Sequence, residues 1–255
     1  MPGGSVLDPA DPHLVVHSRM IYLSWLPADP DVIAALLPAG LRAGEDRRVF
    51  MNQYVVDDET QTSGFGAYSL TYLGVSVAGL DAPDRPLAGG WWTHYLCSSP
   101  RVRGYAAARG APVAAGRTWL EQRGATLVAQ TEVDGVPLIR TRARVGDTGH
   151  VIRSGHHRYL TGRGDALVSG VYPYLAEPVA PFEVESVDFF DPDHPVYPLR
   201  PANPLVITAG FYSPRASFAY PGGESVLARS PAATVGRAGH QVPASRARSG
   251  LPSGS

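Results

Sequence analysis

The sequence predicts a mainly β fold of the α+β type, built from many short strands with a few short helices between them. Two observations carry this prediction. The 255 residues include 28 glycines and 24 prolines spread along the chain, and such frequent breaking residues favour short strands over long helices. The segments between them combine β-branched and aromatic residues, often in alternation with polar ones, which is typical of half-buried strands. With 44% hydrophobic and 18% charged residues, the composition is that of a globular domain.

The first third of the chain predicts a strand, a short helix and three further strands. Residues 15–25 are rich in β-branched and aromatic side chains and predict the first strand. Asp29 and Pro30 then form a helix start, with Asp29 as N-cap and Pro30 at the first helical position. This helix covers residues 32–37. The next strands are expected at residues 49–56, 67–79 and 89–96.

The remaining two thirds predict one more short helix and at least five strands. The Ala-rich residues 104–110 favour the helix. A meander is expected over residues 126–133, 136–145 and 150–159, with Asp134 and Gly135 as the tight turn of its first hairpin. Late strands follow at residues 182–190 and 205–219.

These elements predict a single domain with loose ends. We expect a flexible arm over residues 1–13, one β domain with a closed or curled sheet over residues 14–220, and a disordered tail over residues 221–255. The tail is dominated by Gly, Ser, Ala, Pro and Arg, and such a composition does not support a packed core.

Charge and cysteine usage exclude several classes of function. Arginines and acidic residues nearly balance, 22 against 23, so the net charge of −1 creates no field that would attract nucleic acid or an anionic membrane. Cys97 is the only cysteine, which is typical of a reducing compartment. No apolar run approaches the length of a membrane span, and the start of the chain has no signal-peptide pattern. We therefore expect a cytoplasmic protein whose partner is a small molecule, with no nucleic acid and no membrane.

The chain contains no lysine, because all 22 basic residues are arginine. A lysine amine with a lowered pKa is the usual group for Schiff-base catalysis, whereas a guanidinium stays protonated at any working pH. Chemistry through a lysine imine is therefore excluded.

Two segments of the central region resemble the acetoacetate decarboxylase family. These are Tyr95-Leu96-Cys97-Ser98-Ser99-Pro100 and, after it, Ala111-Pro112-Val113-Ala114-Ala115-Gly116. Residues 19–38, 63–68 and 213–216 are also similar to the family, so the resemblance covers about residues 14–220. It implies a double-cone β-barrel with a central cavity, in a protein that is usually a homo-oligomer.

The resemblance also implies that the family's catalytic groups are lost here. Val113 stands where the family has its imine-forming lysine, and Ala114 where it has the neighbouring lysine that lowers the pKa. Asn52 and Leu70 occupy the positions of two active-site glutamates. Arg19 matches the arginine of the first strand.

Three residues are candidates for non-covalent catalysis. Arg19 would hold an anionic or carbonyl oxygen inside the barrel, although a strand arginine can equally point to solvent. His94 would move a proton, although it can equally be a histidine bonded within the core. Asn52 would orient a carbonyl or an oxyanion as a neutral donor.

Other residues are expected to form the wall that binds the substrate. The aromatic members favour a flat, apolar or aromatic ligand. The set comprises Tyr68, Leu70, Tyr72, Trp92, Tyr95 and Val113. His156 and His157 are adjacent on a strand and so point to opposite faces, which argues against a shared metal ion. We expect neither a metal nor an organic cofactor.

The leading hypothesis is an enzyme of specialised metabolism with a lyase or isomerase activity. It would act on a carbonyl-bearing molecule, such as a polyketide-derived intermediate, by acid/base and enolate-stabilising chemistry. Cyclisation, dehydration, isomerisation and decarboxylation all fit this logic. Two alternatives stay open: a non-catalytic small-molecule binding protein, and a β-keto acid decarboxylase that works without an imine.

Overall fold

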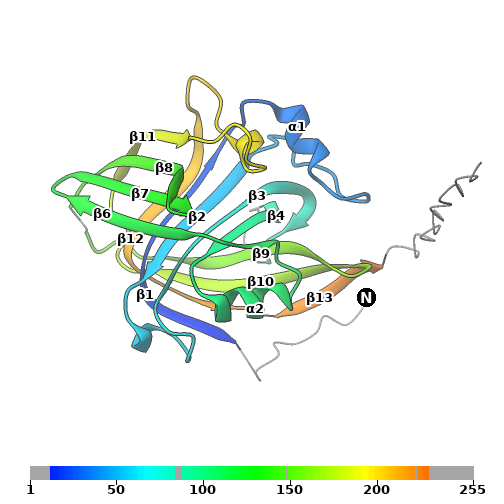
Figure 1. Cartoon of the computed structure of the whole chain (residues 1–255), viewed down its shortest axis with the longest axis horizontal. Coiled ribbons are helices and arrows are strands. Elements are labelled where there is room, and N and C mark those ends of the chain that lie inside the picture. The colour runs from blue at the N-terminus through cyan, green and yellow to red at the C-terminus, as the bar shows by residue number, and fades with distance from the viewer. Residues whose placement is uncertain (1–11, 84–87, 148, 222, 230–255) are drawn as a thin grey trace, which may run out of the picture.

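The computed structural model describes residues 12–83, 88–147, 149–221 and 223–229 and shows a closed β-barrel with a second sheet on its outside (Figure 1). Seven strands close the barrel, in the order β12-β1-β2-β3-β4-β9-β10 and back to β12. They are β1 (His13–Trp25), β2 (Val49–Val56), β3 (Tyr68–Asp81), β4 (Ala88–Cys97), β9 (Arg153–Arg163), β10 (Ala166–Ala176) and β12 (Ile207–Tyr220).

Two short strands extend the barrel sheet. β5 (Val113–Ala115) pairs with β4, and β13 (Glu224–Arg229) pairs with β10. The β4–β5 and β4–β9 pairings are parallel, and the other pairings of this sheet are antiparallel. The mainly β fold predicted from the sequence is therefore confirmed, including the barrel.

A four-stranded antiparallel sheet packs against one side of the barrel, beside β1, β2 and β3 (Figure 1). Its order is β11-β8-β7-β6, and its strands are β6 (Arg117–Arg123), β7 (Thr126–Val133), β8 (Val136–Val145) and β11 (Phe182–Phe189). Asp134 and Gly135 join β7 to β8 with φ of 52° and 79°, the left-handed pair that a tight hairpin turn requires.

Alternation along the barrel strands sorts the apolar side chains into two cores. On β1, Ile21, Leu23 and Trp25 face the four-stranded sheet and form the inter-sheet core, whereas Met20 belongs to the barrel interior. The interior is rich in aromatic rings. They include Tyr54, Tyr68, Tyr72, Trp92, Tyr95, Tyr159, Tyr172 and Tyr220.

A buried polar network crosses the inter-sheet core and fixes how the two sheets face each other. Gln53 of β2 donates from Nε2 to the Thr131 hydroxyl of β7 at 3.0 Å and accepts at Oε1 from the Thr141 hydroxyl of β8 at 2.8 Å. The Thr71 hydroxyl lies 2.6 Å from that of Thr131 and 2.7 Å from that of Thr118. Because buried polar groups are costly when unpaired, this network favours a single relative position of the sheets.

Two α-helices and two 3-10 turns fill the connections. α1 (Pro30–Ala35) has Asp29 as its N-cap, whose carboxylate accepts from the backbone N–H groups of residues 31 and 32, as predicted. α2 (Pro100–Ala107) has Ser99 as its N-cap, so it begins four residues before the predicted start at residue 104. The short turns are η1 (Glu59–Gln61) and η2 (Tyr197–Leu199).

The structure corrects three further expectations. The expected meander ends after its hairpin, because β9 leaves for the barrel and β8 pairs with β11 instead. Strands β5, β6 and β10 lie where no strand was predicted. The predicted tail from residue 221 contains β13, whose Glu224 accepts a hydrogen bond from the Tyr159 hydroxyl at 3.1 Å. Residues 1–11 of the predicted arm and residues 230–255 of the predicted tail lie outside the described residues, and His13 is buried at the start of β1.

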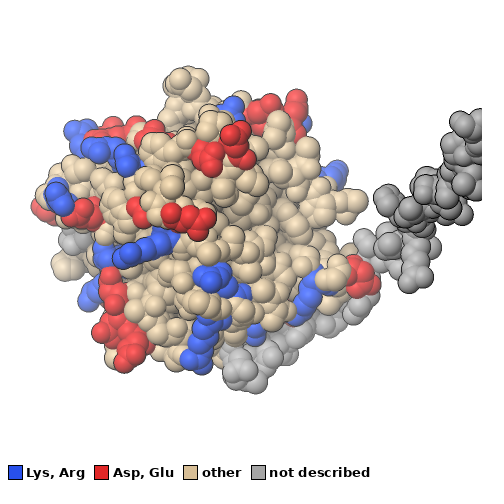
Figure 2. Space-filling view, in the orientation of Figure 1, with Lys and Arg blue, Asp and Glu red and all other residues tan. Residues whose placement is uncertain are grey.

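Arginine and acidic side chains are interspersed on the face shown in Figure 2, and neither sign dominates it. Cross-strand pairs account for part of this mixture. Arg144 of β8, for example, lies 2.8 Å from Glu183 of β11. Charges of both signs are thus mixed on the visible face.

Gly170 is required where β10 passes the ring of Tyr159, because a Cβ at this position would overlap that ring. Tyr159 has no room to yield, since it stacks on Trp92 at 4.5 Å between ring centroids. We expect Gly170→Ala to lower the free energy of unfolding by about 1–3 kcal/mol, measured by urea titration. Gly104→Ala, on α2 with open space around it, is the control and should be neutral or slightly stabilising. Equal effects of the two changes would refute the packing argument.

Candidate functional site

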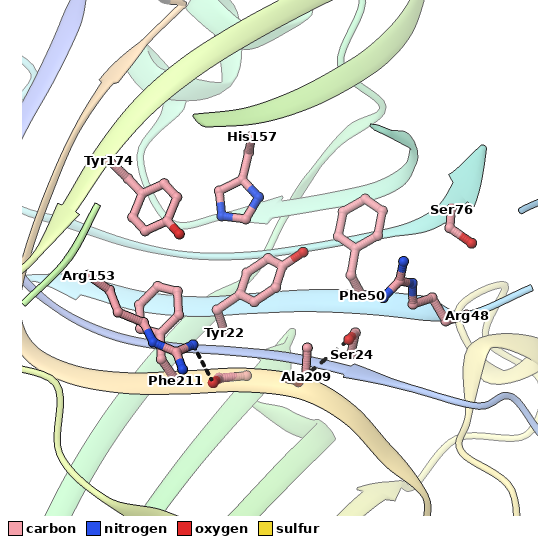
Figure 3. Close-up of a pocket in the computed structure, with 11 residues that line it drawn as sticks. Tyr22, Ser24, Arg48, Phe50, Ser76, Arg153, His157, Tyr174, Ala209 and Phe211 are labelled. Carbon is pink, nitrogen blue, oxygen red and sulfur yellow. Dashed lines mark hydrogen bonds between the residues drawn. The ribbon is translucent and has the colours of Figure 1, made fainter. Parts of the chain in front are cut away.

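A pocket opens at one mouth of the barrel, with a cavity volume of about 90 Å³ (Figure 3). We call it the mouth pocket. It combines cationic, aromatic and hydroxyl side chains, and none of its lining residues is acidic. It is lined by Tyr22, Ser24, Arg48, Phe50, Ser76, Arg153, His157, Tyr174, Ala209, Gly210 and Phe211.

Strand register brings these residues together from six strands or their ends. Tyr22 and Ser24 are two apart on β1 and so share a face, where they pair across the sheet with residues 52 and 50 of β2 and with residues 211 and 209 of β12. On β9, Arg153 and His157 are four apart and also share a face. β10 pairs with β12 and so closes the barrel, which brings Tyr174 next to the β12 residues of the mouth pocket.

Four rings form one aromatic wall of the mouth pocket. The Tyr174 and Phe211 rings are nearly parallel, at 6° and 5.7 Å between centroids. The imidazole of His157 lies 4.7 Å from the ring of Tyr22 and 4.7 Å from that of Tyr174. These faces suit a flat ligand, because aromatic rings pack well against planar groups.

Two guanidinium groups stand at opposite ends of the mouth pocket, with the ring of Tyr22 between them (Figure 3). Arg153 donates to the backbone carbonyl of Gly210 at 3.5 Å. Arg48 forms an ion pair with Asp46 at 2.8 Å. Burial raises the pKa of Tyr22 above its usual range, so its phenol is neutral at physiological pH and can donate a hydrogen bond.

Two tyrosines, Tyr72 and Tyr172, lie behind lining residues of the mouth pocket, and we call this pair its floor. The ring of Tyr72 lies 6.2 Å from that of Phe50, and the ring of Tyr172 lies 5.2 Å from His157. The hydroxyls of Tyr72 and Tyr172 are hydrogen-bonded to each other. Burial raises the pKa of Tyr72 to about 12, so this floor is uncharged.

Below this floor the barrel interior is almost filled. The remaining cavity has a volume of about 20 Å³, which is room for about one water molecule. Its lining residues are Asn52, Tyr54, Tyr72, Trp92, Tyr95, Tyr172, Phe218 and Tyr220. Asn52 donates to the Tyr72 hydroxyl at 3.3 Å, while its buried Oδ1 has no hydrogen-bond partner among the described residues.

Comparisons with known proteins find the same architecture in solved structures. An acetoacetate decarboxylase superposes with a TM-score of 0.63 at 16% identity, over 88% of this chain and 92% of the other. The acetoacetate decarboxylase of Legionella pneumophila gives 0.60 at 17% identity, over 90% and 93%. The enduracididine biosynthesis enzyme MppR, in complex with the condensation product of pyruvate and imidazole 4-carboxaldehyde, gives 0.57 at 12% identity, over 86% and 90%.

The chain has the acetoacetate decarboxylase-like fold. No protein-family model matches the sequence, and no curated protein matches it either. At identities of 12–17%, the likeness establishes the fold and leaves the chemistry to be argued from the site itself.

Within this acetoacetate decarboxylase-like barrel, most of the predicted wall residues lie in the interior. Tyr72, Trp92 and Tyr95 line the small central cavity together with Asn52. Tyr68 and Leu70 are buried in the same interior core, where the Tyr68 hydroxyl lies 2.9 Å from that of Tyr54. Val113, on β5 beside Tyr95, packs against this core from its edge.

Arg19 does not enter the barrel interior, which corrects its predicted role. It pairs with Val55 across β1 and β2 and lies on the face of β1 that looks toward the four-stranded sheet. Its guanidinium donates to both carboxylate oxygens of Asp57, at 2.8 and 2.6 Å, and to the backbone carbonyl of Leu120. Asp57 raises the pKa of Arg19 through these hydrogen bonds. The side chain thus joins the two sheets.

Replacing Arg19 with glutamine should therefore affect stability only slightly and function not at all. The side chains of Arg19 and Asp57 are 34% and 49% exposed, respectively. Ion pairs that are this exposed contribute about 1 kcal/mol or less to the free energy of unfolding. We expect Arg19→Gln to lower the free energy of unfolding by that amount, measured by urea titration, and to leave ligand binding unchanged. Loss of ligand binding by a folded Arg19→Gln variant would show that Arg19 belongs to the site.

His94 also lies outside the barrel interior. The pairing of β3 with β4 shifts between residues 73 and 74, and this bulge places His94 opposite Leu73, a residue of the inter-sheet core. Its ring is 6.2 Å from that of His194. Burial, and then His194, lower the pKa of His94 to about 4, so it is neutral at physiological pH. Arg19, His94 and Asn52 therefore do not form one catalytic group.

Sequence reasoning missed the residues of the mouth pocket. In the sequence, Tyr22 and Ser24 are recognisable only as strand residues, and Arg48 and Arg153 belong to no motif. His157 stands out only as half of an adjacent histidine pair. Within the described residues, no cluster of three or more His, Cys, Asp or Glu is placed to hold a metal ion, and no helix is long and apolar enough to cross a membrane.

Proposed function

We propose that this protein is an enzyme that binds a carbonyl-bearing small molecule in the mouth pocket and acts on it without forming a covalent imine. One observation carries the proposal. The mouth pocket places an imidazole, a neutral phenol and two guanidinium groups around an aromatic-lined space that is open to solvent. Pockets that combine apolar walls with a few converging polar groups are the usual sites of small-molecule chemistry.

The structures that share this fold support the substrate class. They include acetoacetate decarboxylases, and MppR has been solved with pyruvate, a 2-oxo acid. By analogy with these structures of the same fold, we infer that the substrate of this chain also carries a carbonyl group. The polar groups of the mouth pocket are suited to bind a carbonyl oxygen.

Removal of a proton or a carboxyl group next to a carbonyl places negative charge on the carbonyl oxygen. Tyr22 would donate a hydrogen bond to that oxygen and so stabilise its charge. His157 would accept the proton or return it. Cyclisation, dehydration, isomerisation and imine-independent β-keto acid decarboxylation all generate this charge, so each belongs to the proposed class of lyase or isomerase chemistry.

Covalent catalysis is disfavoured by the nucleophiles that the chain offers. There is no lysine. The thiol of Cys97 is buried, and burial raises its pKa to about 12, so it is protonated and unreactive.

A carrier function is the second candidate, and the packed interior favours it. Aromatic rings occupy the space below the floor of the mouth pocket, and the residues that line the remaining cavity include no acidic or cationic group. A protein that only holds its ligand needs no such group.

Mass spectrometry of a metabolite extract from the source organism separates the two functions. The extract is incubated with wild type and with Tyr22→Phe, which removes only the phenol oxygen. An enzyme consumes one metabolite and forms a product, and Tyr22→Phe slows this conversion. If a metabolite binds to the protein and is recovered unchanged, the protein is a carrier and the proposed enzyme function is wrong.

A further inference from the structure

The two arginines of the mouth pocket differ in how far their charge is already balanced. Arg48 has a carboxylate partner, since its Nε lies 2.8 Å from Asp46 Oδ2. Asp46 is held in place by two further donors: its Oδ1 accepts from the Ser76 hydroxyl at 3.2 Å and from the backbone N–H of Arg48 at 3.3 Å. This end of the pocket is a neutral polar network.

Arg153 has no such partner among the described residues. It donates to the carbonyl of Gly210 at 3.5 Å, which orients the guanidinium without cancelling its charge. Figure 3 shows Arg153 at the end of the mouth pocket opposite to Arg48. One end therefore carries a net positive charge, and the other offers donors and acceptors with little net charge.

We propose that the mouth pocket is specific for a flat monocarboxylate that binds in one orientation. Its carboxylate pairs with Arg153, its planar body lies against the aromatic wall, and its far end carries a hydroxyl or carbonyl that meets Arg48 and Ser76. This proposal rests on the proposed function, because it names the substrate class of the same site.

Charge complementarity sets the specificity. A carboxylate gains a charge-assisted hydrogen bond from a guanidinium that has no carboxylate of its own. A second carboxylate at the far end would face Asp46 as well as Arg48, and like charges brought close together cost free energy. A dicarboxylate should therefore bind more weakly than a monocarboxylate with a hydroxyl at the far end.

Three probes of one shape test the proposal by isothermal titration calorimetry at low ionic strength, where charge pairing is least screened. They are 4-hydroxybenzoate, 4-hydroxybenzamide and terephthalate, that is, one, no and two carboxylates on the same ring. We expect 4-hydroxybenzoate to bind wild type about tenfold more tightly than either of the others. Arg153→Gln should abolish its advantage over the amide, and Arg153→Lys should keep part of it.

Asp46→Asn is the decisive variant, because it should create binding instead of destroying it. Asparagine keeps an oxygen acceptor for Ser76 while it removes the charge that balances Arg48. We expect the affinity for terephthalate to rise about tenfold relative to that for 4-hydroxybenzoate.

Three other outcomes would each contradict a different part of these proposals. If wild type binds terephthalate as tightly as 4-hydroxybenzoate, or if Asp46→Asn gains nothing for terephthalate, the assigned charge pattern is wrong and the proposed function stands. If wild type binds none of the probes but converts a metabolite, the ligand class is wrong. If it neither binds the probes nor binds or converts any metabolite, both proposals fail.

Discussion

Replacement of His157 with glutamine is expected to lower the rate of substrate conversion by about 10²–10⁴-fold, the usual contribution of general acid–base catalysis. Glutamine keeps hydrogen-bonding capacity at a similar size but does not titrate near neutral pH. The imidazole is well placed for proton transfer, since it lies against the ring of Tyr22 on the wall of the mouth pocket.

Initial rates measured by mass spectrometry, with the metabolite identified from the extract, would test this expectation. His150→Gln is the matched control, because His150 is exposed and is not among the residues of the mouth pocket. It should retain the wild-type rate. A loss below about threefold for His157→Gln, or the same loss in both variants, would remove His157 from the proton-transfer role.

Acid should destabilise the protein well before its carboxylates are fully protonated, because the buried His13 and the partly buried His94 have lowered pKa values. Burial lowers the pKa of His94 to about 4, and burial together with Arg109 lowers that of His13 to about 4, against 6.5 for an ordinary histidine. In the unfolded chain these two histidines therefore become protonated below about pH 6.5, whereas in the folded chain they become protonated only near pH 4. Stability is full above pH 6.5 and falls as the pH drops through this window, by at most about 3 kcal/mol per histidine.

Urea unfolding of wild type and His94→Gln at pH 7 and pH 5 would measure this effect. Carboxylates titrate in both proteins, so the difference between them isolates His94. The stability advantage of wild type over the variant should shrink by about 1–2 kcal/mol between pH 7 and pH 5. An advantage that stays constant or grows would show that His94 titrates normally in the folded protein.

Local structure could be predicted from the sequence wherever a local signal sets it. Val49–Val56 is a strand because it is β-branched and aromatic, and α1 begins after Asp29 because an aspartate followed by proline caps a helix. The partner of each strand was harder to predict. β9 follows β8 in the chain but pairs with β4 and β10, and nothing within residues 150–159 signals that departure.

Prediction of the candidate site likewise required knowing which strands pair and which face each side chain occupies. The resemblance correctly placed Asn52 in the barrel interior. The proton-transfer role considered for His94 does not fit, because a bulge between β3 and β4 turns that side chain toward the inter-sheet core, and such a bulge leaves no clear mark on local alternation. Arg19 was placed on the wrong face of β1. Its spacing from Ile21 and Leu23, which are two and four residues further on, is the signal that would have put it on the inter-sheet side.

The mouth pocket was missed because barrel closure assembles it from distant strands. Arg48 and Arg153 are separated by more than a hundred residues, and each looks like an ordinary surface arginine in the sequence. A weak signal was available on β1, where Tyr22 and Ser24 continue the alternation that places Met20 in the interior.

Whether the mouth pocket is the ligand site can be tested by blocking this pocket and measuring ligand binding. Ala209 is exposed and lines this pocket, so Ala209→Trp would fill it from the rim without disturbing the core. Val136→Trp, at a position that is 64% exposed on the hairpin of the four-stranded sheet, is the control. We expect wild type and Val136→Trp to capture the metabolite and Ala209→Trp to lose it. Unchanged capture by a folded Ala209→Trp variant would show that the ligand binds elsewhere.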